Sequence, residues 1–303
     1  MPIKPPDLDP TTCFIGGAWV PSDKGEVLEI INPSNGDLLC HVARGGASDI
    51  DAAVEAATRA SQGHWASMAA FERGRVLSRL GELVLENADR LARIEAMDVG
   101  KPLKQARADA VALARYLEFY GGAADKVHGH TLPYLTGYTA YTLREPHGVT
   151  GHIIPWNYPM QIIGRSVGAA LAMGNTCVLK PAEDACLTAL AFAELARRAE
   201  LPDGVLNVVP GLGTEAGAAL SHHPGVHHLS FTGSVDVGRR VQQAAAENVV
   251  PVTLELGGKS PQLVFDDADI EASLPFLVNA GIQNAGQTCS AASRILVQRD
   301  VYQ

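Results

Sequence analysis

The sequence predicts an α/β protein whose second half is built around a parallel sheet and whose first half supplies a helical layer. Two observations support this fold class. From Val149 onward, short β-rich runs alternate with alanine-rich helical stretches, which is typical of parallel strands joined by βαβ crossovers. Before them, residues 71–120 keep a helical spacing of apolar positions almost without interruption.

The N-terminal part predicts short strands followed by helices. Residues 14–42 alternate apolar and polar side chains around Gly-rich and Asn-Pro turn signals, so a ribbon of antiparallel strands is expected. Ser48 followed by Asp51 has the form of a capping box and predicts a helix start. Further helices are expected over residues 71–86, 87–99 and 102–120, with Asn87 as a cap and Gly100 as a stop.

The later elements follow in order. Residues 131–145 predict a projecting hairpin, because Thr139, Tyr141 and Thr142 favour extended structure. Parallel strands are expected at residues 149–154, 177–180, 205–209, 228–231 and 252–254.

Composition excludes several classes of function. The 303-residue chain is 47% hydrophobic and 19% charged, as expected for a folded protein of roughly two domains. A net charge of -9 without a Lys/Arg stripe argues against a nucleic-acid partner. Residues 162–173, the most apolar stretch, are broken by Gly164 and Arg165, so no membrane span is expected. Residues 1–10 lack the basic-then-apolar order of a signal peptide.

The cysteines and histidines indicate a reducing compartment and no metal. Five cysteines are scattered through the chain without a Cys-x-x-Cys pair, which argues against disulfides or a zinc ribbon. The histidines of residues 222–228 flank a Pro-Gly turn without a cluster of Cys or carboxylate ligands. We therefore expect a cytoplasmic protein without a bound metal.

Cys289 is the candidate nucleophile. It lies between small and polar residues, in Asn-Ala-Gly-Gln-Thr-Cys-Ser over residues 284–290, after a helical stretch. A free thiol has a pKa of about 8.5, so a reactive cysteine needs a nearby base, cation or helix N-terminus. The alternative, from the residues alone, is a small buried hydrophobic side chain.

Glu255 is the candidate base. It follows the apolar run 252–254 and precedes Gly257-Gly258-Lys259, so a carboxylate is expected at a strand end beside glycines. Sheets of this class bind ligands at their strand ends, glycines permit close approach, and a carboxylate there can activate water. The alternative is an ordinary turn in which Glu255 pairs with Lys259.

Three further segments indicate a nucleotide site. Residues 231–234, Phe-Thr-Gly-Ser, end a strand and begin a helix, which suits phosphate binding or else a simple serine N-cap. Lys180 and Glu183 could bind the hydroxyls of a ribose or form a surface salt bridge. Residues 211–216 match Gly-x-Gly-x-x-Gly/Ala, but in the third βα unit, and the first turn, 154–157, has no glycine.

The order of the motifs resembles that of the aldehyde dehydrogenase superfamily. The motifs are Pro-Trp-Asn at 155–157, Lys-Pro-Ala-Glu at 180–183, Phe-Thr-Gly-Ser at 231–234, Glu-Leu-Gly-Gly-Lys-Ser at 255–260 and Gly-Gln-Thr-Cys at 286–289. The resemblance spans essentially the whole chain. A chance occurrence of these motifs in this order is implausible.

The resemblance implies a role for each motif residue. Cys289 matches the family nucleophile, Glu255 its general base, and Asn157 the amide that holds the oxyanion together with the Cys289 backbone N–H. Lys180 and Glu183 match adenosine-ribose contacts. The other expected cofactor contacts are Gly233 and Ser234 at the pyrophosphate, Gly213 near the adenine, and Ile153, Pro155, Trp156, Thr232, Leu256 and Gly257.

The implied reaction is the oxidation of an aldehyde to a carboxylic acid with NAD. A Cys289 thiolate attacks the aldehyde, hydride departs to the nicotinamide, and Glu255 activates the water that hydrolyses the thioester. Because Glu183 would repel a 2′-phosphate, NAD is expected rather than NADP. The alternatives are an inactive or structural dinucleotide-binding fragment, and a coenzyme A-acylating relative, in which the glutamate is dispensable.

The resemblance also implies domains and an assembly. Residues 1–127 are expected to form N-terminal strands and helices of a cofactor-binding domain, 128–146 an oligomerisation hairpin, 147–257 a Rossmann-like NAD-binding domain, and 258–303 the beginning of a catalytic domain. The sequence ends fourteen residues after Cys289, so a C-terminally truncated fragment is expected. The complete protein is expected to be a homodimer or homotetramer, and several classes of aldehyde remain open as substrates.

Overall fold

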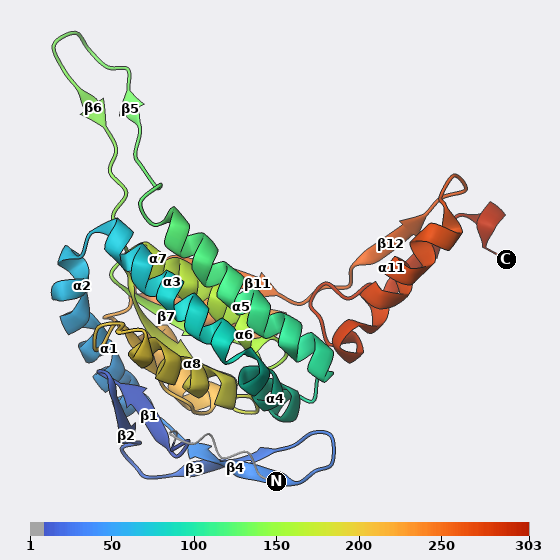
Figure 1. Cartoon of the computed structure of the whole chain (residues 1–303). Helices are drawn as coiled ribbons and strands as arrows, with labels where there is room; N and C mark the ends of the chain where they lie inside the picture. The colour runs from blue at the N-terminus through green and yellow to red at the C-terminus, as the bar shows by residue number, and fades with distance from the viewer. Residues whose placement is uncertain (1–8, 303) are drawn as a thin grey trace.

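A seven-stranded sheet forms the centre of the molecule. A computed structural model describes residues 9–302, so residues 1–8, where we expect no signal peptide, lie outside the described residues. The strands are β1 (Thr12–Ile15), β2 (Ala18–Pro21), β7 (Val149–Ile153), β8 (Thr176–Lys180), β9 (Leu206–Val208), β10 (His228–Gly233) and β11 (Val252–Leu256). Their order is β11-β10-β7-β8-β9-β1-β2 (Figure 1). Strands β7 to β11 run parallel, and β1 is antiparallel to both β9 and β2.

Helices cover both faces of the sheet, because successive residues of a strand point to opposite sides. The helices are α1 (Ala47–Ser61), α2 (His64–Ser67), α3 (Ala70–Glu86), α4 (Ala88–Val99), α5 (Leu103–Ala123), α6 (Pro159–Ile162), α7 (Ala169–Ala172), α8 (Leu187–Arg198), α9 (Ala218–His222) and α10 (Val235–Glu247). In β8, Cys177 and Leu179 share a buried core with α3, α5 and α8. Val178, between them, belongs to the core formed with α1, α9 and α10.

The order of the parallel strands creates a crevice between β7 and β10. β7 comes first in the chain, β8 and β9 lie on one side of it, and β10 and β11 lie on the other. The chain that leaves β7 therefore turns toward β8, and the chain that leaves β10 turns the opposite way, toward β11. In open α/β sheets, ligands bind outside the carboxyl ends of the strands at such a switch point.

Most of the predicted elements are confirmed; the predicted start of α1 is wrong, and Asn87 precedes α4 as predicted but makes no side-chain cap. Gly46, not Ser48, precedes α1, and its N–H donates to the Asp49 carboxylate at 2.8 Å, so Asp51 has no part in a capping box. The Asn87 side chain donates to the Leu83 carbonyl at 2.7 Å at the end of α3, and makes no cap on α4. At α1, the Asp49 carboxylate thus takes the place of the predicted Asp51.

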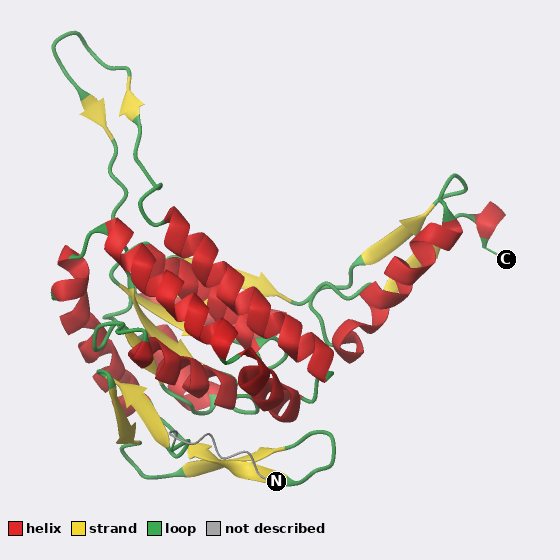
Figure 2. Ribbon diagram, viewed as in Figure 1, coloured by secondary structure: helices red, strands yellow, loops and turns green. Residues whose placement is uncertain are grey.

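The N-terminal ribbon is divided in the structure. The pair β1 and β2 extends the central sheet, whereas β3 (Val27–Ile31) and β4 (Leu38–Ala43) form a separate antiparallel pair. The predicted hairpin is present, with only short strands β5 (Thr131–Leu132) and β6 (Ala140–Tyr141) below a long loop (Figure 2).

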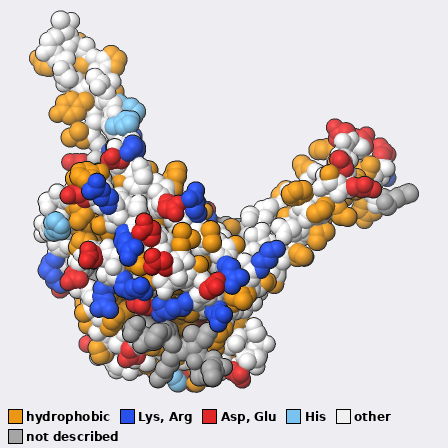
Figure 3. All heavy atoms as spheres, in the orientation of Figure 1, with side chains coloured by type: hydrophobic (Ala, Val, Ile, Leu, Met, Phe, Trp, Pro, Cys, Tyr) orange, Lys and Arg blue, Asp and Glu red, His pale blue; other side chains and the backbone are white. Residues whose placement is uncertain are grey.

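Residues 258–302 form a C-terminal arm. In it, β12 (Pro261–Val264) and β13 (Arg294–Val297) pair in parallel and are joined by α11 (Ile270–Ile282), which makes a βαβ unit. No residue of α11 is buried, and Phe276 is 77% exposed. Figure 3 shows hydrophobic side chains gathered along this arm. The arm thus leaves an apolar helix face uncovered in the part of the chain that the structure describes.

Candidate active site

A cavity of about 680 Å³ lies at the carboxyl ends of β7, β8, β10 and β11, and we call it the crevice. Segments distant in the sequence line it: the turn after β7, the ends of β8, β10 and β11, and the segment 283–290 that follows α11. All the residues predicted for the site are part of its wall: Ile153, Pro155, Trp156, Asn157, Lys180, Glu183, Gly213, Thr232, Gly233, Ser234, Glu255, Leu256, Gly257 and Cys289. The structure thus brings together every predicted site residue.

A tight turn presents Cys289. Asn284 and Ala285 have positive φ angles of 50° and 57°, and Gly286 follows at 77°. Non-glycine residues rarely adopt this region, and such strain persists where the surroundings fix it. Here Asn284 is buried, and its amide donates to the Asn157 carbonyl at 3.3 Å, whereas Cys289 itself is exposed.

Two hydrogen bonds join the turn after β7 to the nucleophile segment. The Asn157 amide nitrogen donates to the Gln287 carbonyl at 2.8 Å, and the Tyr158 hydroxyl lies 3.0 Å from the Thr288 hydroxyl. A primary amide has two N–H groups, so Asn157 keeps one N–H for a second acceptor. Asn157, which carries this second N–H, and Cys289 both line the crevice.

Glu255 is the penultimate residue of β11, with its side chain 58% exposed. Lys259 donates instead to the Gly258 carbonyl, so the alternative Glu255–Lys259 pair is wrong. The nearest cation is Arg165, whose Nη2 is 4.0 Å from a Glu255 carboxylate oxygen. A Cβ placed on Gly258 would lie 3.4 Å from the Cys289 carbonyl, which shows how closely the two segments approach.

Cys289 differs from the other thiols in its exposure. Cys13, Cys177 and Cys186 are buried and Cys40 is half-buried, whereas Cys289 is exposed in the wall of the crevice. Burial raises the pKa of Cys177 to about 12, so this thiol stays protonated near pH 7. Since the thiolate is the nucleophile, Cys177 is unsuited to this chemistry.

Lys180 and Glu183 form a partly buried pair at the crevice wall. The ammonium group of Lys180, a residue only 2% exposed, donates to Glu183 at 2.8 Å, so the salt bridge considered as an alternative is present, in a partly buried position. The Gly213 N–H donates to the other Glu183 oxygen at 3.3 Å. Burial alone would raise the pKa of Glu183, but the hydrogen bond and charge of Lys180 outweigh it and the pKa is lowered.

The helix α10 begins at the crevice with a serine cap. The Ser234 hydroxyl accepts a hydrogen bond from the Val237 N–H at 3.3 Å, which confirms the N-cap interpretation. The phosphate-binding role of Gly233 and Ser234 remains a prediction.

Comparison with known proteins decides the family. A model of the aldehyde dehydrogenase family matches residues 19–303. The chain belongs to the aldehyde dehydrogenase family. A hydroxyisobutyraldehyde dehydrogenase of Mycolicibacterium austroafricanum is 47% identical over 292 residues, which is 96% of this chain and 58% of that protein. The chain thus spans about 60% of the length of the aldehyde dehydrogenases that it matches.

Solved structures of aldehyde dehydrogenases share the fold. A Burkholderia cenocepacia protein assigned to these enzymes is 63% identical, with a TM-score of 0.95 over 96% of this chain and 61% of that one. A Bacillus cereus aldehyde dehydrogenase in complex with NAD⁺ is 42% identical, with a TM-score of 0.95 over 97% of this chain and 60% of that one.

Sequence reasoning missed a group of buried charges that contacts α6. The ammonium group of Lys101 is completely buried and lies 2.6 Å from both Glu95 and Asp109. Glu95 also accepts a hydrogen bond from the Met160 N–H at 3.3 Å, and Asp109 accepts one from the Gln161 side chain at 2.7 Å. The signal was available, because Glu95 and Asp109 occupy positions on the apolar stripes of α4 and α5.

Residues 9–302 contain neither a membrane-spanning helix nor a cluster of metal ligands. No helix in this range has the length and apolar content needed to cross a bilayer. Within the same range, no three His, Cys, Asp or Glu side chains form a group that could hold a metal ion.

Proposed function

We propose that the protein carrying this chain oxidises an aldehyde to a carboxylic acid through a thioester on Cys289, with NAD as hydride acceptor. One observation carries the proposal: Cys289, Asn157 and Glu255 line the same crevice, and hydrogen bonds tie the Asn157 turn to the Cys289 segment. A thiol, an amide donor and a carboxylate are the three groups that acyl chemistry on a cysteine requires.

The crevice fits a dinucleotide. Its volume of about 680 Å³ falls in the range typical of cofactor sites. Lys180 and Glu183 offer a cation and an ionised carboxylate for ribose hydroxyls. The backbone at Gly213 and Gly257 is open to a ligand, because a Cβ at either position would meet nothing closer than 3.7 Å. The N-terminus of α10, with Gly233 and Ser234, would hold the pyrophosphate. When bound, the nicotinamide supplies the hydride acceptor.

The chain's own residues carry the remaining steps. The Cys289 thiolate attacks the carbonyl carbon, and the developing alkoxide accepts hydrogen bonds from the Asn157 amide and the Cys289 N–H. Loss of hydride converts the adduct into a thioester. Glu255 then takes a proton from water, which attacks the thioester and releases the acid and the free thiol.

We propose NAD as the preferred cofactor because of Glu183. Its lowered pKa keeps the carboxylate charged near pH 7, and that charge accepts hydrogen bonds from ribose hydroxyls but repels a 2′-phosphate. The NAD⁺ complex of the Bacillus cereus relative supports binding of NAD.

Assembly, domains and compartment are further proposals. The hairpin of residues 128–146 exposes Tyr134, Tyr138 and Leu143, each at least 67% accessible, which supports its role in joining subunits of a homodimer or homotetramer. We propose the domain divisions 1–127, 147–257 and 258–303 around it. Five free thiols support a reducing, cytoplasmic setting.

The test is NADH formation from aldehyde and NAD. It is run on this chain and on the complete product of its gene, with a Cys289→Ala variant and a Cys177→Ala control. We expect NADH formation that Cys289→Ala abolishes and Cys177→Ala retains. Turnover by Cys289→Ala at the original rate would refute the proposal.

A further inference from the structure

A second cavity, of about 740 Å³, lies beside the crevice. Side chains of α3, α5 and α7 line one side of it, and residues of β7, β10 and β11 line the other. It shares four residues with the crevice: Ile162, Arg165, Thr232 and Glu255. A molecule that occupies the second cavity therefore reaches Glu255 without passing the Lys180 end of the crevice.

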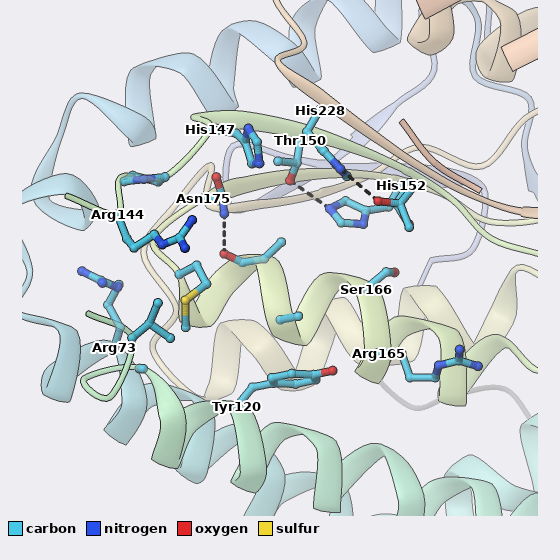
Figure 4. A pocket seen from close by; sticks show the side chains of 18 of the residues that line it. Arg73, Tyr120, Arg144, His147, Thr150, His152, Arg165, Ser166, Asn175 and His228 are labelled. Carbon is cyan, nitrogen blue, oxygen red and sulfur yellow. Dashed lines mark hydrogen bonds between the residues drawn. The ribbon is translucent and has the colours of Figure 1, made fainter. Parts of the chain in front are cut away.

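The charged lining of the second cavity is mainly cationic. Its arginines are Arg73, Arg144 and Arg165, and its only carboxylates among the described residues are Glu145 and Glu255. Figure 4 shows Arg73 and Arg144 at one end and Arg165 at the other. The cavity thus offers positive charge at both ends.

The arginines differ in the hydrogen bonds that they already make within the protein. Arg73 donates to the carbonyls of Met68 and Ala172 at 2.7 and 3.4 Å, which fixes it in the wall. Arg165 makes no hydrogen bond among the described residues, and its closest carboxylate oxygen, on Glu255, is 4.0 Å away. It lies on the π-helix Ile163–Gly168, a local distortion that is frequent at functional sites. Its guanidinium therefore keeps its donors for a ligand.

The floor of the cavity is polar and uncharged. His152 is 2% exposed, and its ring nitrogen lies 2.9 Å from the Thr150 hydroxyl, as the dashed line in Figure 4 marks. Burial, with a smaller contribution from His228, lowers the pKa of His152 to about 3, so the ring is neutral near pH 7. Its other ring nitrogen has no hydrogen-bond partner among the described residues. A purely apolar ligand would leave the free ring nitrogen of His152 and the guanidinium group of Arg165 without hydrogen-bond partners.

We propose that the second cavity binds the carboxylate end of an aldehyde substrate, with Arg165 as the cation nearest to Glu255. The substrate is then an oxo acid and the product a dicarboxylate. This inference rests on the proposed function. The aldehyde carbon gives up a hydride to NAD, water supplies the second oxygen, two protons are released, and the distal carboxylate is unchanged. Arginine suits this role because its planar donors bind a carboxylate through two parallel hydrogen bonds.

The first test compares oxo acids with neutral aldehydes of the same chain length, from three to six carbons. The ratio of their kcat/KM values should favour the oxo acid and fall at least about tenfold in Arg165→Gln, which corresponds to the loss of one charge-assisted hydrogen bond. Arg75→Gln, an exposed arginine outside both cavities, should keep the ratio. A preference of the original protein for neutral aldehydes, or an unchanged ratio in Arg165→Gln, would overturn the inference while leaving aldehyde oxidation intact. If no aldehyde is oxidised, the proposed function fails and the inference fails with it.

The second test needs no turnover. Iodoacetamide alkylates the exposed Cys289, and the modified peptide is quantified by mass spectrometry. Glutarate should slow this alkylation in the original chain, glutaramide should not, and the protection by glutarate should be lost in Arg165→Gln. Equal protection by both compounds, or protection that survives the substitution, would contradict a carboxylate site.

Discussion

The ammonium nitrogen of Lys101 lies 4.1 Å from the centre of the Tyr158 ring, directly beneath the segment that carries the candidate oxyanion donor. The Tyr158 hydroxyl in turn lies 3.0 Å from the Thr288 hydroxyl, one residue before Cys289. A buried cation, an aromatic ring and a hydroxyl pair thus connect the helical layer to the nucleophile segment. The position of Asn157 and Cys289 therefore depends on charges buried away from the crevice.

Lys101→Met should destabilise the fold strongly. The substitution leaves Glu95 and Asp109 buried without their cation, and breaking one side of a buried ionic cluster costs about 3 to 5 kcal/mol. Urea unfolding measures the loss. Lys104→Met, at a neighbouring exposed lysine, is the matched control and should change the free energy of unfolding by less than about 0.5 kcal/mol. Equal effects of the two substitutions would show that the buried cluster is not a stabilising element.

Asp98 should make stability fall as pH rises. Burial raises the pKa of Asp98 to about 8, and the Leu187 N–H bond only partly opposes this. The unfolded chain has a value near 3.9. The folded state thus favours the protonated carboxyl, a contribution that is fully present below about pH 4 and lost as pH rises through about 8.

The matched variant is Asp98→Asn, which does not titrate and keeps an oxygen that can accept from Leu187. Between pH 5 and pH 8, the free energy of unfolding of the original chain should fall relative to this variant, by at most about 1.4 kcal/mol per pH unit. Identical pH profiles of the two proteins in urea unfolding would contradict a raised pKa.

Asn157→Ala should slow the proposed reaction. It removes the side-chain donor to the developing alkoxide, a loss worth about 3 kcal/mol or roughly 10²-fold in kcat. NAD affinity, measured by titration calorimetry, should change little, since the substitution targets the acyl step. Unchanged turnover would refute the oxyanion role of Asn157.

The fold was largely readable from the sequence because its signals are local, whereas the roles of the site residues came from the order of the motifs along the chain. Alternation of β-rich and helical runs reveals the strands β7 to β11, and the candidate catalytic residues occupy the ends of strands or a glycine-rich turn. Parallel topology then brings those ends to one edge of the sheet. The convergence of Cys289 and Asn157 on one crevice follows from this topology together with the position of the segment after α11.

The features that sequence reasoning missed depend on tertiary contacts. Whether Asp49 or Asp51 completes the start of α1 is decided by which carboxylate reaches the Gly46 N–H. The burial of Lys101 depends on acidic partners that come from two different helices. The second cavity is formed by residues from α3 to β11, and no local pattern marks it.

Glu183→Gln should increase the use of NADP. Removal of a partly exposed carboxylate relieves a repulsion of about 1 kcal/mol with a 2′-phosphate, so the NADP-to-NAD ratio of kcat/KM should rise about fivefold. Asp184→Asn, at the adjacent exposed carboxylate outside the crevice, should leave the ratio as it is. An equal shift in both variants would indicate a general charge effect instead of a ribose contact.

Cys289 should become acylated during turnover, and peptide mass spectrometry detects this adduct. A Glu255→Gln variant, in which hydrolysis is slowed, is incubated with aldehyde and NAD, quenched with acid and digested. The peptide containing Cys289 should gain the mass of the acyl group, and the peptide containing Cys177 should not. An acyl group on Cys177 or any other residue, or NADH formed in a first turnover without an adduct on Cys289, would contradict this prediction.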